Sequence, residues 1–345
     1  MNMKIDFKKD NGPADKIINE LIGLSGGIKR PEIVRDMIIA SLKAGQEDDG
    51  AVDLKFMDTS LKEMRFTAKA FRPYRHIRKV SVFGSARTRP ESSDYRMAVS
   101  LGQKLAAAGY MTITGGGPGI MQAVNEGAGP DYSFGVNIRL PFEQKINPVI
   151  EGNPKSITYK YFFNRKVAFL KESDAIVLFP GGFGTLDEGI ETLTLVQTGK
   201  RNPVPIIFIE EPGGTYWTKW IEFIEATLLT HGYISRSDLS LFERIESVED
   251  AVERIRDFYS RYHSLRYIGD RLVIRLSSGI SQERVKELKT RFSGIMRQEG
   301  DIYLSGPFPE EADEAEIGHL PRLVLDFNRK DFGGLRSLID SINKL

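Results

Sequence analysis

Pro180-Gly181-Gly182-Phe183-Gly184-Thr185-Leu186-Asp187-Glu188 is the stretch that decides how this chain folds. It follows the apolar run 175–179, which is typical of a buried parallel strand, and it precedes residues 185–198, whose apolar side chains recur at helical spacing. A glycine turn between a strand and a helix lets backbone amides approach a ligand closely, and the helix N-terminus favours an anion. We therefore predict a phosphate-binding turn at 181–185, where Thr185 either caps the helix or donates its hydroxyl to the anion.

Acidic side chains follow this turn. Glu188 lies one helical turn further on, so we expect its carboxylate at the rim of the pocket, facing the sugar of a phosphate-anchored nucleotide. Asp187 is adjacent in sequence, but neighbouring positions on a helix point in different directions, and we expect it to point elsewhere. Glu191 shares the helix face of Glu188 and either contacts the base or ribose or is a structural carboxylate.

Composition excludes several classes of protein. The chain has 345 residues, 41% of them hydrophobic and 28% charged, which is enough for a full core and more than one domain. A net charge of +1 argues against nucleic acid as a partner. The absence of cysteine excludes disulfides and thiolate metal sites, and the scattered histidines lack metal-ligand spacing, so we expect no metal and no cofactor.

The N-terminus and the apolar runs of the sequence indicate the cellular location of the protein. The first ten residues are charged and lack the apolar core of a signal peptide, and the longest apolar runs are too short to span a bilayer. We therefore expect a cytoplasmic protein with no membrane partner.

Strands and helices alternate from residue 79 onward. We predict strands at 79–85, 111–114, 134–140, 175–179 and 204–209, and helices at 94–108, 120–128, 185–198, 216–229 and 247–262. This order predicts an α/β fold, a Rossmann-like parallel sheet with helices on both faces. Ligands of such sheets bind at the carboxyl ends of the strands, where the turns 84–85, 115–119 and 181–185 all fall.

The chain divides into three predicted parts. Residues 1–75 form a helical N-terminal extension with helices at 14–24, 31–44 and 60–71, and residues 76–262 form the nucleotide-binding domain. Residues 263–345 form a small ferredoxin-like α+β module with strands at 271–276, 301–305 and 322–327 and helices at 282–296 and 332–342. The module either binds an effector or partner or packs structurally. We expect its core to close independently, so that a chain ending near Tyr262 stays folded.

The glycine turns do not form a dinucleotide fingerprint. The first turn lacks spaced glycines, and the run 115–119 is followed by Ile120 where the last glycine of G-x-G-x-x-G would fall. An acidic residue for the ribose about 20 positions on is not evident, and a Walker lysine is missing. A mononucleotide fits this pattern better than a dinucleotide or a triphosphate.

Four strings of residues together resemble the LOG (Lonely Guy) family, whose bacterial members carry the label of possible lysine decarboxylases. They are Gly84-Ser85, the run 114–121, Arg165-Lys166 and the opening stretch 180–188, and the resemblance covers residues 76–230. It implies a Rossmann-like homodimer or higher homo-oligomer that hydrolyses nucleoside 5′-monophosphates, such as AMP, to a free base and ribose 5-phosphate. It also implies that the catalytic pair is Arg165 and Glu188.

Substrate and phosphate binding is assigned to the turn residues and their charged neighbours. These are Gly84, Ser85, Gly115, Gly116, Gly117, Gly119, Lys166, Gly181, Gly182, Gly184, Thr185 and Glu191. The sequence departs from the plant pattern at Ala168, where plant-type members have an acidic residue, and this argues against a cytokinin-specific pocket. The decarboxylase label lacks support, because no lysine is marked as the Schiff-base partner of pyridoxal phosphate.

The chemistry also follows from the residue types. Cleavage of an N-glycosidic bond builds positive charge on the sugar, and a carboxylate such as Glu188 stabilises that charge or orients water. Arg165 is permanently charged, and it holds the phosphate, holds the ribose hydroxyls or offsets charge on the leaving base. The alternative is a non-catalytic protein that binds a nucleotide or carries the molybdenum cofactor in the same pocket.

Overall fold

The computed structural model describes residues 6–47, 50–141 and 145–345, which form two compact units, Met1–Phe66 and Thr67–Leu345. In the first unit, α1 (Pro13–Ser25) and α2 (Pro31–Glu47) pack through Ile18, Ile22 and Ile39. The helix α3 (Val52–Phe71) spans the boundary between the units. The three predicted N-terminal helices are confirmed, each with a longer extent than the apolar spacing indicated.

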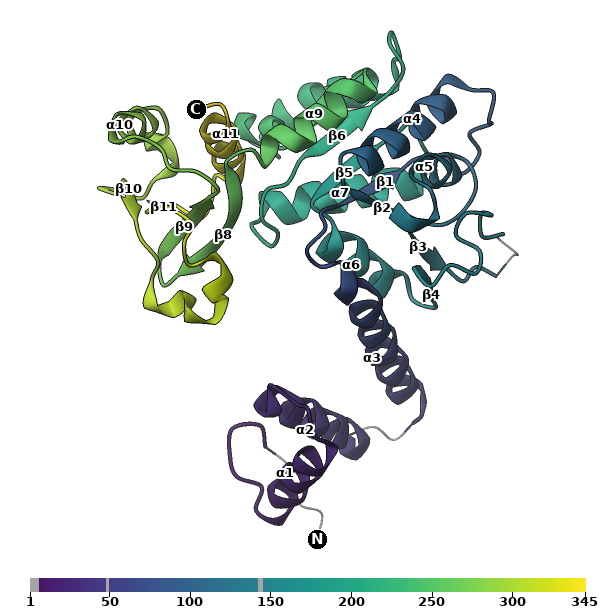
Figure 1. Ribbon diagram of the computed structural model, residues 1–345, viewed down its shortest axis with the longest axis vertical. Coiled ribbons are helices and arrows are strands. Elements are labelled where there is room, and N and C mark those ends of the chain that lie inside the picture. The colour runs from purple at the N-terminus through teal and green to yellow at the C-terminus, as the bar shows by residue number, and fades with distance from the viewer. Residues whose placement is uncertain (1–5, 48–49, 142–144) are drawn as a thin grey trace. The chain divides into compact units, whose positions relative to one another are not determined.

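A parallel sheet forms the centre of the second unit (Figure 1). Within the described residues it has seven strands in the order β4-β3-β2-β1-β5-β6-β7, and every neighbouring pair is parallel. The strands are β1 (Lys79–Phe83), β2 (Met111–Thr114), β3 (Ser133–Ile138), β4 (Ser156–Tyr159), β5 (Ala175–Leu178), β6 (Ile206–Ile209) and β7 (Glu243–Ile245). The chain moves outward from β1 to β4 and then returns to β5 on the other side of β1, so the topological switch point lies between β1 and β5.

Helices cover both faces of this sheet, as the alternation predicted (Figure 1). One face packs against α4 (Ser93–Ala107), α5 (Ile120–Ala128) and α9 (Val248–Phe258). The other face packs against α6 (Phe162–Glu172), α7 (Phe183–Gln197) and α8 (Tyr216–Phe223), which continues as a π-helix over Ile224–Leu229. The strand residues alternate between the two cores: Val80 and Val82 face the first set of helices, and Phe83 faces the second.

The C-terminal residues form a second, antiparallel sheet in the order β10-β11-β9-β8. Its strands are β8 (Tyr262–Ile268), β9 (Arg271–Leu276), β10 (Ile302–Ser305) and β11 (Arg322–Leu325), and its helices are α10 (Gln282–Arg291) and α11 (Phe332–Asn343). The predicted order omitted β8. The helix predicted at 247–262 extended to Tyr262, the residue at which β8 begins. The α+β character is confirmed, whereas the three-part division of the chain stays a prediction.

The junction between the two sheets is buried rather than a loose linker. Arg336 of α11 is buried, and its guanidinium donates to the carbonyl of Val204 at 3.0 Å and pairs with Glu243 at 3.0 Å. Phe258 and Tyr262 belong to the same apolar core as the C-terminal strands. The expectation that a chain ending near Tyr262 stays folded is therefore withdrawn, because that cut divides a shared core.

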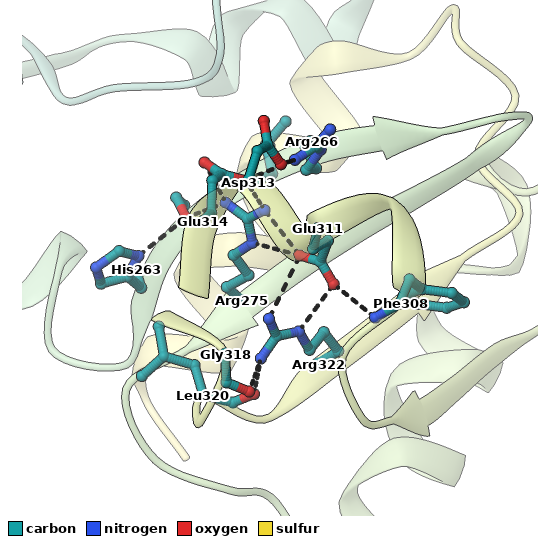
Figure 2. Close-up of polar contacts among 12 residues, drawn as sticks. His263, Arg266, Arg275, Phe308, Glu311, Asp313, Glu314, Gly318, Leu320 and Arg322 are labelled. Atoms are coloured by element: carbon teal, nitrogen blue, oxygen red, sulfur yellow. Dashed lines mark hydrogen bonds and ion pairs between the residues drawn. The ribbon is translucent and has the colours of Figure 1, made fainter. Parts of the chain in front are cut away.

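A network of buried charges fastens the 3-10 segment η6 (Pro309–Ile317) to the antiparallel sheet (Figure 2). Glu311 pairs with Arg275 of β9 at 2.7 Å and with Arg322 of β11 at 3.2 Å, and it accepts a hydrogen bond from the amide of Phe308 at 3.0 Å. Burial alone would raise the pKa of Glu311, but these donors lower the pKa to about 2. The carboxylate is therefore held in its charged form.

Candidate functional site

A cavity of about 750 Å³ lies at the carboxyl ends of β1 and β5, at the switch point of the parallel sheet. Nine predicted site residues line it: Gly84, Ser85, Gly115, Arg165, Gly181, Gly182, Gly184, Thr185 and Glu188. It also contains residues that the sequence did not assign to the site: Phe83, Ala86, Arg87, Met121, Phe162, Phe183, Leu186 and Asp187. The three turns that follow β1, β2 and β5 thus meet around one space.

Backbone hydrogen bonds hold these turns against one another. The amide of Ser85 donates to the carbonyl of Pro180 at 3.1 Å, and the amide of Ile120 donates to the carbonyl of Ser85 at 3.1 Å. The hydroxyl of Tyr216 donates to the carbonyl of Gly181 at 2.5 Å. The cavity is therefore walled by backbone that three separate strand ends fix in place.

Gly181 lies in the turn before α7, where the backbone passes close to Thr185. A Cβ at this position would lie 2.1 Å from the hydroxyl oxygen of Thr185, so a larger residue would displace the turn. The helix begins at Phe183 with Gly182 as its N-cap, and the N-cap makes no side-chain hydrogen bond. Thr185 is therefore in the first turn rather than at the cap, and of its two predicted roles only hydroxyl donation to an anion still applies. Phe183, Gly184 and Thr185 of the first turn of α7 line the same space, and the amide of Thr185 donates to the carbonyl of Gly182 at 3.0 Å.

Arg165 reaches the cavity from α6. Its Nε donates to the carbonyl of Val136 at 2.9 Å, and its guanidinium lies over the ring of Phe169. A Cβ on Gly115 would lie 2.7 Å from Nη2 of Arg165, so the glycine is required for the arginine to occupy this position. Burial lowers the pKa of Arg165, and the nearby charge of Glu188 opposes that shift. Arg165 is therefore a partly buried cation at the cavity wall and not a surface ion pair.

Glu188 is 5% exposed and lines the cavity from α7. Its Oε1 lies 3.3 Å from Nζ of Lys166. Its Oε2 is buried and has no hydrogen-bond partner among the described residues. Burial raises the pKa of Glu188, and Lys166 and Arg165 only partly offset that rise. Lys166 thus positions one carboxylate oxygen, and the other is buried without a hydrogen-bond partner among the described residues.

Lys166 joins three carboxylates of α7. Its Nζ lies 2.7 Å from Asp187, 3.3 Å from Glu188 and 2.8 Å from Glu191. Burial would lower its pKa, but the bonds to Asp187 and Glu191 outweigh this effect, and the pKa of Lys166 is raised. Lys166 and Glu191 therefore lie behind Glu188 and not on the cavity wall. The expectation that Asp187 points elsewhere is wrong, because its carboxylate converges on Lys166.

The other predicted glycines lie next to this cavity. Gly116 and Gly117 line an adjoining space of about 230 Å³, together with Asn137 and Arg139. Gly119 has a positive φ and is the N-cap of α5. Gly115 belongs to the walls of both cavities. The triple-glycine run therefore forms the partition between the two spaces.

Some cavity residues were missed by the sequence reasoning. Arg87 lies in the same turn as Ser85, and this position was its only indication. Phe162 and Phe183 are large exposed apolar side chains, and Phe183 is 93% exposed. Asn125 is fully buried and accepts hydrogen bonds from Thr114 and Asn147. That bond network supports the triple-glycine turn from behind.

The described helices include none with the length and apolar character that crossing a bilayer requires.

Comparison with known proteins gives matches over this domain. Residues 119–255 match the sequence family described as "Possible lysine decarboxylase". The cytokinin riboside 5′-monophosphate phosphoribohydrolase LOG1 of Arabidopsis thaliana is 25% identical over 193 residues, which are 55% of this chain and 87% of the relative. The probable phosphoribohydrolase LOGL3 of Oryza sativa subsp. japonica is 26% identical over 190 residues, covering 54% of this chain and 82% of the relative.

A solved structure of the molybdenum cofactor binding protein from Rippkaea orientalis is 21% identical to this chain. The alignment covers 52% of this chain and 94% of that protein, with a TM-score of 0.38.

Proposed function

We propose, from the premise that residues 119–255 belong to the LOG family, that this protein hydrolyses the N-glycosidic bond of nucleoside 5′-monophosphates. The products are a free base and ribose 5-phosphate. The observation that carries the proposal is Glu188, a buried carboxylate whose Oε1 is held by Lys166 and whose Oε2 has no partner among the described residues. It lies in the same cavity as a glycine turn suited to phosphate.

Each part of the cavity has a role in this reaction. The turn 181–185 binds the 5′-phosphate through amides of the first turn of α7. That anchor places the ribose near Glu188, whose carboxylate stabilises the positive charge that develops on the sugar ring. Glu188 takes a proton from the water that attacks C1′ as the N-glycosidic bond breaks. It then passes this proton to the departing base and returns to its carboxylate form. Arg165 supplies positive charge on the opposite wall, toward the phosphate or the leaving base.

Lys166 argues against the decarboxylase name that the family carries. A lysine that forms a Schiff base must lose its proton, which is favoured when its surroundings lower the pKa. The pKa of Lys166 is raised by its carboxylate partners, so it stays protonated. Its proposed task is to hold Glu188 in position.

Incubation of the protein with a panel of nucleoside 5′-monophosphates tests this function directly. We expect release of free base, measured by liquid chromatography, and we expect the matching nucleosides to react poorly because they lack the phosphate anchor. Equal efficiency with adenosine and AMP would contradict the phosphate-binding turn. Binding of nucleotide without any turnover would instead favour the carrier alternative.

We also propose that the protein acts as a homodimer. Large apolar side chains of α6 and α7 are exposed, and a second copy of the chain would cover them: Phe162 and Phe183, which line the cavity, and Val167 and Ile190 on the same helices. Light scattering after size-exclusion chromatography measures the mass of the assembly. A monomer at micromolar concentration would contradict the proposal.

A further inference from the structure

A second cavity lies at the opposite ends of the same central strands. Its volume is about 300 Å³, and it is lined by residues that precede β1, β5 and β6, with Arg78, Asp174 and Arg201 among them. The C-terminal part of the chain closes it with residues from the end of α9 and the start of β8. We call this space the junction cavity. The catalytic cavity follows β1 and β5, so the length of the strands separates the two sites.

Arg201 is the unusual residue of the junction cavity. Its Nη2 donates to the carbonyl of Ser173 at 2.6 Å. Its Nη1 is buried and has no hydrogen-bond partner among the described residues, and the ion pairs of that part of the chain do not include Arg201. A buried guanidinium without a counter-charge is costly, because the charge loses water and gains no partner. Burial lowers the pKa of Arg201 to about 10, so the group is still charged at neutral pH.

Arg201 has no ion-pair partner among the described residues of the junction cavity, and the charge of Asp174 offsets its burial only in part. Asp174 is the acidic residue of the wall, but its carboxylate already accepts from the amide of Lys79 at 2.8 Å and pairs with Arg78 at 3.4 Å. Arg78 also stacks on the ring of Tyr259 at 3.6 Å, which fixes its guanidinium in the wall. Lys171 also lines the cavity and pairs with Glu172, which is not part of the wall. The charged groups of the wall are therefore the guanidinium groups of Arg78 and Arg201, the ammonium of Lys171 and the engaged carboxylate of Asp174.

His263 and Ser264 form the wall contributed by β8, and both are anchored to the charge network of the antiparallel sheet (Figure 2). The ring of His263 is hydrogen-bonded to Ser264 at 2.9 Å, and Ser264 accepts from Arg275 at 3.5 Å. Burial and the neighbouring cations Arg78 and Arg275 lower the pKa of His263. The wall on this side is thus neutral and fixed, and it adds no acid.

We propose that the junction cavity binds a small oxyanion, with a phosphate group as the ligand. The guanidinium groups of Arg201 and Arg78 both line the cavity and bind the anion, in the manner in which arginine pairs with phosphate oxygens. The volume suffices for such an anion, because a single water occupies about 30 Å³ of liquid. The site is separate from the proposed catalytic phosphate turn and does not depend on the proposed function.

Hydrogen–deuterium exchange of the full chain, with and without inorganic phosphate, locates the binding. We expect slower exchange in segments 199–205 and 259–265, which form the walls of the junction cavity, whatever happens at 181–188. Glycerol 3-phosphate in place of inorganic phosphate distinguishes a phosphate monoester from the free ion. Protection by either compound supports the site, and the stronger of the two identifies the form of the phosphate group.

Arg201→Met keeps the length of the side chain and removes the charge. We expect the dissociation constant for phosphate at this site to rise about tenfold or more, because charge-assisted hydrogen bonds are lost. The matched control is Arg256→Gln, which removes an exposed arginine that pairs with Glu253 on α9. This control should keep the protection of both segments.

Folding of the variants is checked by thermal unfolding in phosphate-free buffer. Removal of an uncompensated charge should leave the melting temperature of Arg201→Met unchanged or higher, whereas a purely structural arginine would lower it. Arg78→Gln and Arg201→Lys are further variants, and both should weaken phosphate binding. The proposal is overturned if the wild-type segments show no protection with either phosphate compound, or if the protection persists in Arg201→Met.

Discussion

The surroundings of Glu188 determine the pKa and the position of its carboxylate. Burial raises its pKa, while the charge of Lys166 lowers it and holds Oε1. A carboxylate with a raised pKa is a better proton acceptor than an ordinary glutamate near neutral pH. The residue therefore combines positioning with basicity, and each property can be tested by a separate substitution.

Glu188→Gln removes the charge and keeps the shape. We expect a loss of about a hundredfold or more in turnover of nucleoside monophosphates, because one charge that stabilises the transition state is removed. Nucleotide binding and the melting temperature should be retained, since Lys166 still pairs with Asp187 and Glu191. Rates of base release measure the effect. Wild-type turnover by this variant would remove Glu188 from the mechanism.

The acid limb of the pH–rate profile reports the pKa of Glu188. The reaction requires the carboxylate, so the rate falls as pH drops through a pKa that lies above the ordinary value of 4.5. Lys166→Met removes a charge that lowers this pKa, and the limb should therefore move to still higher pH. Lys104→Met, which removes an exposed lysine paired with Glu249, is the matched control and should leave the limb in place. If the acid limb of Lys166→Met lay at the same pH as that of the wild type, the effect of Lys166 on the pKa of Glu188 would be contradicted.

Elements fix the site through their ends, and the turn between β5 and α7 shows how. Gly181→Ala places a methyl group against Thr185, so we expect the turn to shift and the protein to lose about 1–3 kcal/mol of unfolding free energy. The activity should fall more than tenfold, because small displacements of positioned groups cost about a hundredfold. Gly182→Ala, where no atom lies within 4 Å of the new Cβ, should keep the stability. Thermal unfolding and steady-state kinetics compare the two, and equal stability would contradict the packing argument.

Glu311 is the buried acid of the segment η6. Glu311→Gln leaves Arg275 and Arg322 with one carboxylate fewer, and breaking a buried pair of this kind costs about 3–5 kcal/mol. Glu310→Gln, at the exposed neighbouring position, should have little effect. Denaturant unfolding at neutral pH measures both variants.

The same acid predicts a pH dependence. The pKa of Glu311 is lower in the folded protein, about 2, than its ordinary 4.5. Its stabilising contribution is therefore complete above about pH 4.5 and is lost as pH falls toward 2. The stability difference between the wild type and Glu311→Gln should shrink over this window. A constant difference would show that the charge is not what stabilises η6.

The central elements could be predicted because their sequences are strongly apolar and end in glycine. β2 and α5 have the predicted bounds, and β1 and β5 differ only at their ends. The edge strands β4 and β7 were not predicted, because they are short and partly polar. The strand β8 was also not predicted, because helical spacing continues to Tyr262, whereas in the structure β8 pairs with β9. Gly84, Gly115 and Gly181, which follow buried strands, therefore line one cavity, whereas Gly116 and Gly117 line the adjoining one. The bond between Lys166 and Asp187 depends on how α6 faces α7, and α6 itself was not predicted.

At the scale of the whole molecule, the shared core makes residues 67–345 one compact unit. A chain ending at Tyr262 would expose Phe258 and remove Arg336 from the carbonyl of Val204. We expect such a truncated protein to melt at a lower temperature than the full chain or to aggregate. The full-length variant Arg336→Met should have a melting temperature between those of the truncated protein and the wild type. A truncated protein with the wild-type melting temperature would show that the two sheets fold independently.

The strands β1 and β5 carry a cavity at each end, and this arrangement has a kinetic consequence. A ligand of the junction cavity and a substrate of the catalytic cavity occupy different space, so neither displaces the other by contact. Any influence of one on the other must pass through the strands, and it must be reciprocal in affinity. Inhibition or activation by the junction ligand would thus be partial and would reach a plateau at saturating junction ligand, whereas an inhibitor that displaced the substrate would suppress turnover without such a limit.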